Sequence, residues 1–352
     1  MKYERLPNLT AVRFILATLV VTFHIHQFCH NRGFPFFDNL AILNKGTEAV
    51  YMFFSLSGFL IIRQLYREKA ITSSIDLAKF FKRRALRILP LYYIVLLFGL
   101  FYYRFILPYF GFNYENNYNL IWGIFLSFTL FPNIFASYKP GGILEVLWSL
   151  GIEEQFYLLI APLIYILPFK QIVRFLLFFT WVYFVLYFSD YFPFLKKYSM
   201  LFFYFSFSGI CSIWAFNNKI KLQKFNSIVF IIFGLYFTTS IFKNSLTDFY
   251  YHLLSILLFG FTISILVEKP FMVLENRLLN YLGKISYGIY MFHAIMMQMV
   301  GFLYLKFKVP LKISSLNSIL IFNFSVLFFT ILAAHLSYKY IESYFLNLKK
   351  HS

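Results

Sequence analysis

The sequence predicts an all-α, polytopic membrane protein with about ten transmembrane helices. Apolar residues make up 60% of the 352 residues and charged residues only 13%, roughly half the charged share of an ordinary soluble domain. The mean hydropathy is +0.69, and apolar runs of bilayer-spanning length recur along the chain. These runs lack the alternation of polar and apolar residues that marks a membrane β-barrel. The lipid bilayer is therefore the first partner that we expect.

Ten apolar runs are assigned as spanning helices on length and composition. They are residues 8–29, 47–66, 86–106, 147–167, 172–188, 198–216, 225–242, 249–267, 282–305 and 317–341. The run 119–135 is also apolar, but it contains Pro132 and lies between two stronger runs, so we interpret it as an interfacial or re-entrant segment. No repeat or linker-like tract is evident, which indicates a single domain over residues 1–352.

The basic residues of the connecting segments predict the orientation. With both termini on the cytoplasmic side, inner segments hold 21 Lys and Arg residues and outer segments hold 10, which is the usual bias. The net charge of +18 then reflects basic cytoplasmic loops, and we expect no nucleic acid partner. Cys29 and Cys211 show no metal-binding spacing, so we expect no metal. The sequence does not indicate an oligomeric state.

Ionisable residues lie inside the first predicted span. Arg13 and His24 are eleven residues apart, so a helix places them on one face, about three turns or 16 Å apart. His26 faces elsewhere. An ionisable residue within a span is costly and is a functional-site hypothesis by default. The alternative is that Arg13 reaches to the inner surface and that His24 bonds to a neighbouring helix.

A basic cluster stands where the third span enters the membrane. Arg83, Arg84 and Arg87 form this cluster, and Arg84 and Arg87 are neighbours on a helix surface. Two guanidinium groups can hold phosphate through forked, charge-assisted hydrogen bonds. The alternative is an anchor for anionic lipid headgroups.

Three further spans carry candidate residues. In the second span, Ser57 and Gly58 are small enough for close helix packing. In the fourth, Glu153 needs a partner or a water-filled cavity; it could orient a histidine, bind an acceptor hydroxyl, or form a packing ion pair with Arg13. In the ninth, His293 is a buried ionisable group.

Six segments together resemble the acyltransferase-3 family of integral membrane O-acyltransferases. They occur in family order between residues 6 and 345, and they read LPNLTAVRFILATLVVTFH, FFSLSGFLI, FKRRALRILPLYY, WSLGIEEQFYLL, LGKISYGIYMFH and LSYKYIESYF. The resemblance implies about ten spans and a place in a bacterial-type plasma (inner) membrane. Many such proteins modify sugars of cell-surface polysaccharides.

The resemblance also implies roles for the residues that match the family motifs. These residues are Arg13 and His24 of the arginine–histidine motif, Ser57, Gly58 and Phe59 of the serine-glycine-phenylalanine motif, Arg84 and Arg87 of the paired-arginine motif, Glu153, and His293. Arg13, His24 and Glu153 are the expected catalytic residues. Arg83, Arg84 and Arg87 are the expected donor-binding residues, and Ser57, Gly58, Phe59 and His293 support the substrate or the structure.

The predicted function is O-acyl transfer. Acetyl-coenzyme A from the cytoplasm would donate an acetyl group to a hydroxyl of a cell-surface or lipid-linked carbohydrate. A neutral His24 would take the hydroxyl proton, Arg13 would hold the donor or a developing oxyanion, and an acyl-histidine intermediate is an open variant. The alternative from another class is a polytopic transporter or flippase of a glycan or lipid without acyl transfer.

Overall fold

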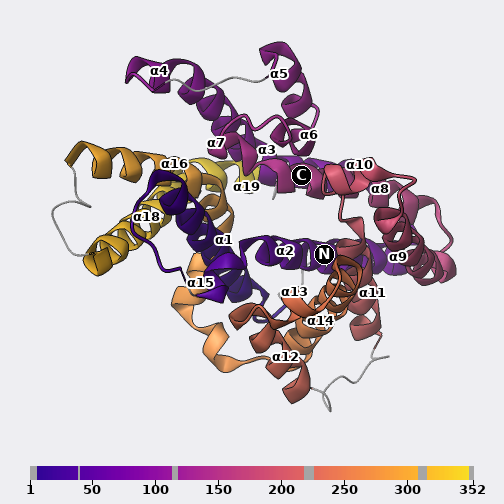
Figure 1. Cartoon of the computed structure of the whole chain (residues 1–352). Helices are drawn as coiled ribbons and strands as arrows, with labels where there is room; N and C mark the ends of the chain where they lie inside the picture. The colour runs from indigo at the N-terminus through magenta and orange to yellow at the C-terminus, as the bar shows by residue number, and fades with distance from the viewer. Residues whose placement is uncertain (1–5, 39, 113–117, 218–225, 308–314, 349–352) are drawn as a thin grey trace.

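The computed structural model describes residues 6–38, 40–112, 118–217, 226–307 and 315–348, and these ranges contain helices and no strands (Figure 1). The α-helices are α1 (Leu9–Arg32), α2 (Gly46–Thr72), α3 (Leu77–Phe101), α4 (Leu107–Tyr109), α5 (Leu120–Phe128), α6 (Pro132–Ala136), α7 (Gly142–Glu145), α8 (Trp148–Ile166), α9 (Ile172–Phe188), α10 (Pro193–Lys197), α11 (Phe202–Phe216), α12 (Asn226–Thr238), α13 (Ile241–Ser245), α14 (Asp248–Glu268), α15 (Arg277–Lys284), α16 (Ser286–Phe307), α18 (Ser315–Ser337) and α19 (Ser343–Leu348). Short π-helical turns, η2 (Tyr102–Ile106) and η6 (Tyr338–Glu342), extend α3 and α18. The all-α prediction is confirmed.

Seven helical segments in the described ranges are long and apolar enough to cross a membrane. They are Leu9–Arg32, Gly46–Thr72, Leu77–Tyr109, Phe169–Phe188, Asp248–Glu268, Ser286–Phe307 and Ser315–Leu348. The other three predicted spans also hold helices. Of these, α11 and α12 are shorter apolar helices, and α8 is not among the seven. The polytopic prediction is therefore confirmed, whereas the count of about ten is not.

The ends of the helices that border the cavity described below follow from local sequence signals. Asp76 caps the start of α3 by accepting a hydrogen bond from the Lys79 backbone N–H at 2.9 Å, as a short acidic side chain at this position commonly does. At the end of α1, Gly33 adopts a left-handed backbone with φ 65°, which glycine tolerates without steric cost. These caps fix where α1 and α3 end and begin.

The apolar run 119–135 folds as two short helices and not as one spanning helix. Between them Leu130 has a positive φ of 66°, and Pro132 opens α6. The Gln155 side chain on α8 donates hydrogen bonds to the Leu130 carbonyl and the Asn133 side chain, at 2.9 and 2.8 Å. In Figure 1, α4 and α5 stand out from the body of the molecule on the side away from α12.

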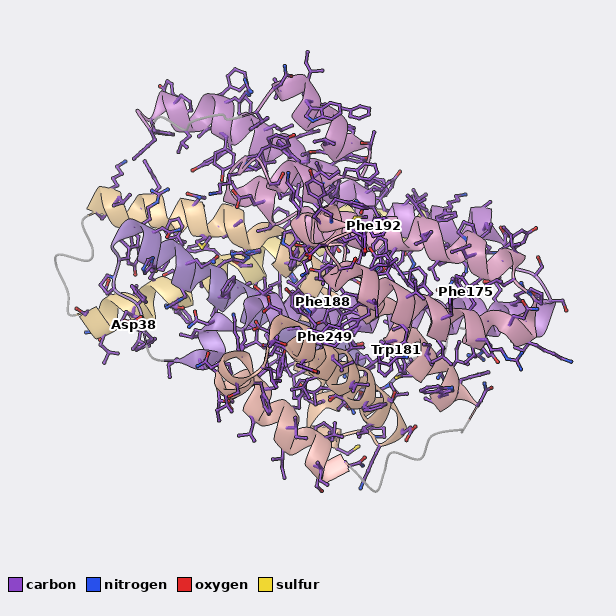
Figure 2. The ribbon with its side chains drawn as sticks, turned by 45° about the vertical axis from the view of Figure 1, so that its right-hand side comes forward. Asp38, Phe175, Trp181, Phe188, Phe192 and Phe249 are labelled. Atoms are coloured by element: carbon purple, nitrogen blue, oxygen red, sulfur yellow. The ribbon has the colours of Figure 1, made fainter. Side chains whose placement is uncertain are left out.

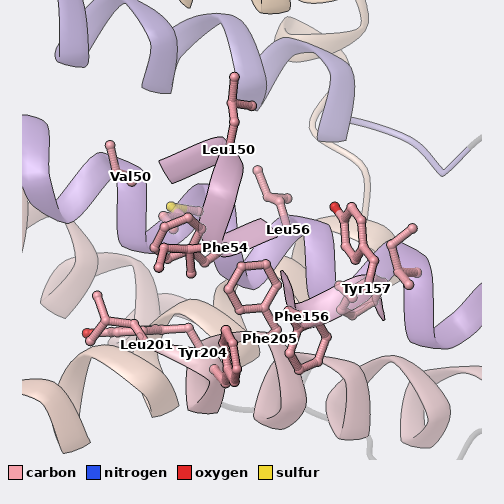
Figure 3. Packing of buried hydrophobic residues seen from close by; sticks show 14 of the residues in the cluster. Val50, Phe54, Leu56, Leu150, Phe156, Tyr157, Leu201, Tyr204 and Phe205 are labelled. Carbon is pink, nitrogen blue, oxygen red and sulfur yellow. The ribbon is translucent and has the colours of Figure 1, made fainter. Parts of the chain in front are cut away.

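The backbones of α2 and α11 approach each other closely. A Cβ atom added to Gly58 would lie 2.1 Å from the Phe205 carbonyl oxygen, so only glycine permits this approach of the two backbones. The Phe205 ring stacks on Phe54 of α2 and on Phe156 of α8, at centroid distances of 4.8 and 4.6 Å. Figure 3 shows this aromatic layer filling the space between the three helices.

The outer surface of α9 is apolar. Phe178 and Trp181, the second of which is labelled in Figure 2, expose 66% and 56% of their surface. The buried side of the same helix includes Phe184, whose ring centroid lies 5.0 Å from that of Phe249 of α14. Phe188, at the end of the helix, also packs against Phe249, with ring centroids 5.3 Å apart (Figure 2). An exposed apolar stripe behind a packed aromatic face is what a helix in contact with lipid tails requires.

Candidate active site

A cavity of about 720 Å³ lies between α1, α2, α3, α8 and α16. Its lining on α2 runs from Val50 to Glu68, about 27 Å of helix at the usual rise per residue. Asp76 at the start of α3 is exposed and belongs to the open end, whereas Phe54 and Leu150 are buried in the interior. The cavity therefore reaches deep into the bundle from the end where α2 leads into α3.

The lining is strongly basic. Among the described residues, seven basic and three acidic side chains line the cavity: Arg13, Arg63, Arg67, Lys79, Arg83, Arg84 and Arg87, with Glu68, Asp76 and Glu153. The excess positive charge lies between low-dielectric walls, where its attraction for an anion is stronger than in bulk water. This composition favours a phosphorylated ligand.

The structure brings the expected acidic residue to the expected arginines. The Ser57 hydroxyl on α2 donates a hydrogen bond to the Glu153 carboxylate on α8. Arg13, Arg87 and Arg84 all act on this carboxylate as nearby charges. Of the three roles open to Glu153, this arrangement favours the ion pair with arginines. Glu154 is buried but does not line the cavity.

Arg84 is held on the inner side of α3. Its guanidinium donates to the Gln64 side chain of α2 at 3.2 Å and lies over the rings of Phe80 and Tyr157, at 5.9 and 5.7 Å. Arg83 and Arg87 line the same cavity. The cluster thus faces a cavity inside the bundle, which favours ligand binding over an anchor in the lipid headgroups.

The serine-glycine-phenylalanine motif has one residue in the cavity lining and two residues in the packing between helices. Ser57 lines the cavity, whereas Gly58 and Phe59 do not. Gly58 forms the close contact with Phe205, and Phe59 is fully buried in the hydrophobic core. The last two residues of the motif therefore fix the position of the first.

His24 and His293 form a stacked pair. Their ring centroids lie 5.1 Å apart and their planes are inclined by 30°. The Nδ1 atom of His293 lies 2.5 Å from the Tyr290 carbonyl; a carbonyl only accepts, so Nδ1 carries the proton. The other ring nitrogen, Nε2, is buried and has no hydrogen-bond partner among the described residues. It is left as an unsatisfied acceptor with the lone pair of a base.

The cavity lining includes Arg13 but neither His24 nor His293. Tyr290 joins the two regions, because it lines the cavity and its ring centroid lies 5.8 Å from that of His293. The Tyr290 hydroxyl donates to the Val146 carbonyl at 2.9 Å and lies 2.7 Å from the Ser149 hydroxyl. The histidine pair thus lies behind a wall residue of the cavity.

Several cavity residues had no place in the sequence-based site. Gln64 and Arg67 follow Ser57 on α2 at intervals of seven and ten residues, which a helix places on one face. That spacing, applied along the whole second span, would have found them. Tyr290 has no such signal, since its position depends on the contacts of its hydroxyl with Val146 and Ser149 around the start of α8.

No group of three or more His, Cys, Asp or Glu side chains in the described part of the chain is arranged to hold a metal ion. Both cysteines are free and buried.

The comparison with protein families agrees with these motifs. A family model described as an acyltransferase domain, acyltransferase-3, matches residues 6–338. The chain belongs to the acyltransferase-3 family. Together with the seven apolar helices, membership identifies an integral membrane acyltransferase and decides against the transporter alternative.

Two relatives of this acyltransferase-3 protein are informative. ORF330 of Acidianus two-tailed virus, provisionally named an acetyltransferase, is 26% identical over 286 residues, which cover 74% of this chain and 76% of the relative. The peptidoglycan O-acetyltransferase OatA of Listeria monocytogenes is 29% identical over 170 residues, which cover 45% of this chain and 24% of OatA. No solved structure matches the chain.

Proposed function

We propose that this protein transfers an acetyl group from acetyl-coenzyme A to a hydroxyl of a cell-surface or lipid-linked carbohydrate. The protein would lie in the plasma (inner) membrane with both termini in the cytoplasm, and the open end of the cavity would face the cytoplasm. The observation that carries the proposal is the basic cavity, which runs from that end to Tyr290 with the histidine pair directly behind it.

The donor would bind with its phosphates among the arginines. Arg84 and Arg87 project from one face of α3 into the cavity, and Arg13 faces them from α1. Guanidinium groups bind phosphate through paired, charge-assisted hydrogen bonds. Glu153, which accepts a hydrogen bond from Ser57, would separate and orient these three arginines before the donor binds. The flexible arm of coenzyme A would then lead the thioester towards Tyr290.

Transfer would take place at the histidines. A neutral His24 would accept the proton of the carbohydrate hydroxyl while that oxygen attacks the thioester carbonyl, and the proton would pass to the departing thiolate of coenzyme A. The carbonyl of Tyr290 fixes the tautomer of His293, whose ring stacks on His24. For the thioester to reach His24, the Tyr290 side chain would have to leave its contacts with Val146 and Ser149.

The carbohydrate acceptor is proposed from the family and from one name. OatA, with which this chain shares 170 aligned residues, is named for acetylation of peptidoglycan. An acceptor outside the cytoplasm would approach from the end of the bundle opposite the cavity mouth. There, α1 continues for two turns beyond His24 to Arg32.

The proposal is tested in membranes that contain the protein and receive acetyl-coenzyme A labelled in its acetyl group. We expect label in base-labile esters of the glycan fraction. Mass spectrometry of surface glycans from cells with and without the protein would identify the acceptor. The His24→Ala variant should lose transfer at unchanged protein level, and Arg84→Ala with Arg87→Ala should mainly raise the KM for acetyl-coenzyme A.

The matched control is Gly234→Ala, which adds a methyl group to open space on α12 and should transfer acetyl groups at the normal rate. Full activity of the His24→Ala variant would remove His24 from the chemistry. Absence of any label in esters, with protein present and folded, would refute the proposed reaction.

A further inference from the structure

The cavity contains a second set of basic residues, nearer to its open end than the arginines assigned to the donor above. Arg63 and Arg67 lie one helical turn apart on α2, and Lys79 and Arg83 lie one turn apart on α3. All four line the cavity. We call them the mouth set, and we call Arg13, Arg84 and Arg87 the inner set.

Arg67 and Lys79 of the mouth set lie nearer the open end than the inner set, whereas Arg83 precedes Arg84 directly in α3 and stands at the boundary between the two sets. Lys79, Arg83 and Arg87 follow one another at intervals of four residues along α3, so each lies about 6 Å deeper than the one before. The inner set lies where Glu153 and Ser57 meet. Arg67 and Lys79 lie close in sequence to Glu68 and Asp76, which also line the cavity near the turn between α2 and α3.

The turn holds the mouth set in place. The Glu68 carboxylate accepts a hydrogen bond from the Asp76 backbone N–H at 2.9 Å, and the Asp76 carboxylate accepts one from the Lys79 backbone N–H at 2.9 Å. Arg63 is fixed from the other side, since its guanidinium donates to the Ser212 carbonyl at 3.4 Å and lies 5.2 Å from the Phe216 ring centroid. The backbone that carries Lys79 and the side chain of Arg63 are therefore held by contacts within the fold.

We propose that the mouth set binds the 3′-phosphate on the ribose of coenzyme A, while the inner set binds the pyrophosphate. This inference rests on the proposed function, because it takes coenzyme A as the donor. Coenzyme A carries phosphate in two places, the pyrophosphate that leads to the acyl arm and the phosphate on the ribose behind it. With the acyl arm pointing inward, the ribose phosphate lies on the mouth side of the pyrophosphate. Two sets of cations at two depths match that order.

The experiment compares coenzyme A with 3′-dephospho-coenzyme A, which lacks only the ribose phosphate. Equilibrium binding to the full-length protein in nanodiscs of neutral lipid is measured for both. We expect the wild type to bind coenzyme A about tenfold more tightly, as one charge-assisted phosphate contact would give. The Arg67→Ala/Lys79→Ala variant should bind coenzyme A about tenfold more weakly and 3′-dephospho-coenzyme A within about twofold of wild type.

Two control variants accompany it. Lys82→Ala/Lys170→Ala removes two exposed charges that do not line the cavity, one next to the mouth set on α3 and one beside Phe169, which stacks on Tyr66 of α2; it should leave both affinities unchanged. Arg84→Ala/Arg87→Ala removes the proposed pyrophosphate contacts and should weaken both ligands equally.

The result that overturns the inference is equal binding of the two ligands by the wild type, or an equal loss for both in the mouth variant. A loss that appears only in nanodiscs with anionic lipid would instead assign the mouth set to lipid headgroups and would also overturn it. Should the mouth variant fail to fold, adenosine 3′,5′-bisphosphate is tested against wild type, where it must displace coenzyme A better than adenosine 5′-phosphate does. Binding is measured without acetyl transfer, so failure of the proposed reaction leaves this test intact.

Discussion

His24 on α1 lies stacked on His293 on α16, with ring centroids 5.1 Å apart. His293 donates from Nδ1 to the Tyr290 carbonyl, and its other nitrogen is buried without a partner in the described structure. Burying an unpaired polar atom costs about 1–3 kcal/mol, so a ligand group that donated a hydrogen bond to this nitrogen would be stabilised there. This stacked pair is the place where we propose that a hydroxyl of the acceptor meets its base, His24.

We predict different losses for the two imidazoles. His24→Ala should lower kcat by about 10²- to 10⁴-fold, the usual contribution of a general base. His293→Ala should lower kcat by about tenfold through loss of the stacked support, and both variants should keep the wild-type KM for acetyl-coenzyme A. Initial rates at varied donor concentration measure both constants. A larger loss of kcat for His293→Ala than for His24→Ala would make His293 the general base and His24 its support.

The sequence predicted part of the basic cavity, Arg13, Arg83, Arg84 and Arg87, but not Arg63, Arg67 and Lys79 or the place where the cavity ends. Arg13, Ser57, Arg84 and Glu153 come from four different helices. Arg13 and Glu153 were identifiable because a charged side chain inside an apolar span needs a reason. Arg84 was identifiable from the basic cluster where the third span begins, and Ser57 from the serine-glycine-phenylalanine motif. Helical spacing alone put His24 on the same face as Arg13. It could not show that Tyr290 of another helix lies at the cavity wall beside the histidines, because that depends on how α16 packs against α1.

The fold was predictable where apolar runs are long and uninterrupted. The runs 8–29, 47–66 and 249–267 correspond closely to α1, α2 and α14. The predicted helix ends were less accurate, as α2 continues to Thr72 and Lys69 near its end is buried. Hydropathy misses such extensions, because the scale gives the same value to a lysine that bonds to carbonyl groups inside the fold and to a lysine in water.

Gly58→Ala should destabilise the protein strongly. The added methyl group would lie 2.1 Å from the Phe205 carbonyl oxygen and 2.3 Å from its Cα atom, and backbone atoms of a packed helix cannot move aside. Overpacking of this kind costs about 1–3 kcal/mol or more, and the shift of α2 would also displace Ser57 from Glu153. Thermal unfolding in detergent micelles measures the effect, with Gly234→Ala as the control that adds the same methyl group in open space. Equal melting temperatures for the two variants would contradict the close contact of α2 and α11.

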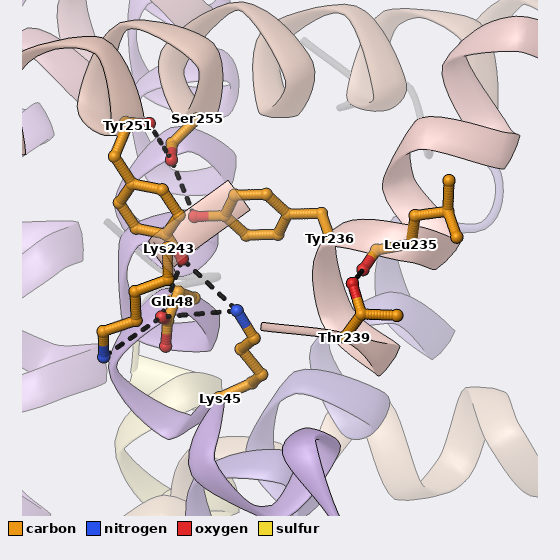
Figure 4. Close-up of polar contacts among 8 residues, drawn as sticks. All are labelled: Lys45, Glu48, Leu235, Tyr236, Thr239, Lys243, Tyr251 and Ser255. Carbon is orange, nitrogen blue, oxygen red and sulfur yellow. Dashed lines mark hydrogen bonds and ion pairs between the residues drawn. The ribbon is translucent and has the colours of Figure 1, made fainter. Parts of the chain in front are cut away.

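A buried polar cluster at the start of α2 allows a double-mutant test. Lys45 and Glu48 are each 2% exposed and their charged atoms lie 3.8 Å apart, while the Tyr251 hydroxyl donates to Glu48 at 2.8 Å (Figure 4). Burial lowers the pKa of the Lys45 ammonium, and Glu48 opposes that shift.

We predict that Lys45→Met destabilises the fold by about 3–5 kcal/mol, because it leaves a buried carboxylate with less compensation. The double variant Lys45→Met/Glu48→Gln should recover at least about 1 kcal/mol of that loss. Unfolding of the wild type, both single variants and the double variant gives the coupling energy. Simple additivity of the two single effects would show that the pair is not coupled in the folded protein.

Lys69 is predicted to hold the end of α8 to α2. Its ammonium donates to the carbonyls of Ile164, Tyr165 and Leu167, at 2.8, 2.7 and 2.5 Å, and so caps carbonyl groups that have no partner within the helix. Lys69→Met keeps the length of the side chain and leaves these carbonyls without the charge. We expect a loss of stability of about 2–4 kcal/mol from hydrogen bonds to a charged donor.

The control is Lys170→Met, at an exposed lysine that follows α8, and this variant should have the unfolding free energy of the wild type. Because α8 also carries Glu153, the Lys69→Met protein that remains folded should show a raised KM for acetyl-coenzyme A, and an unchanged KM would separate the anchoring of α8 from the geometry of the arginine site.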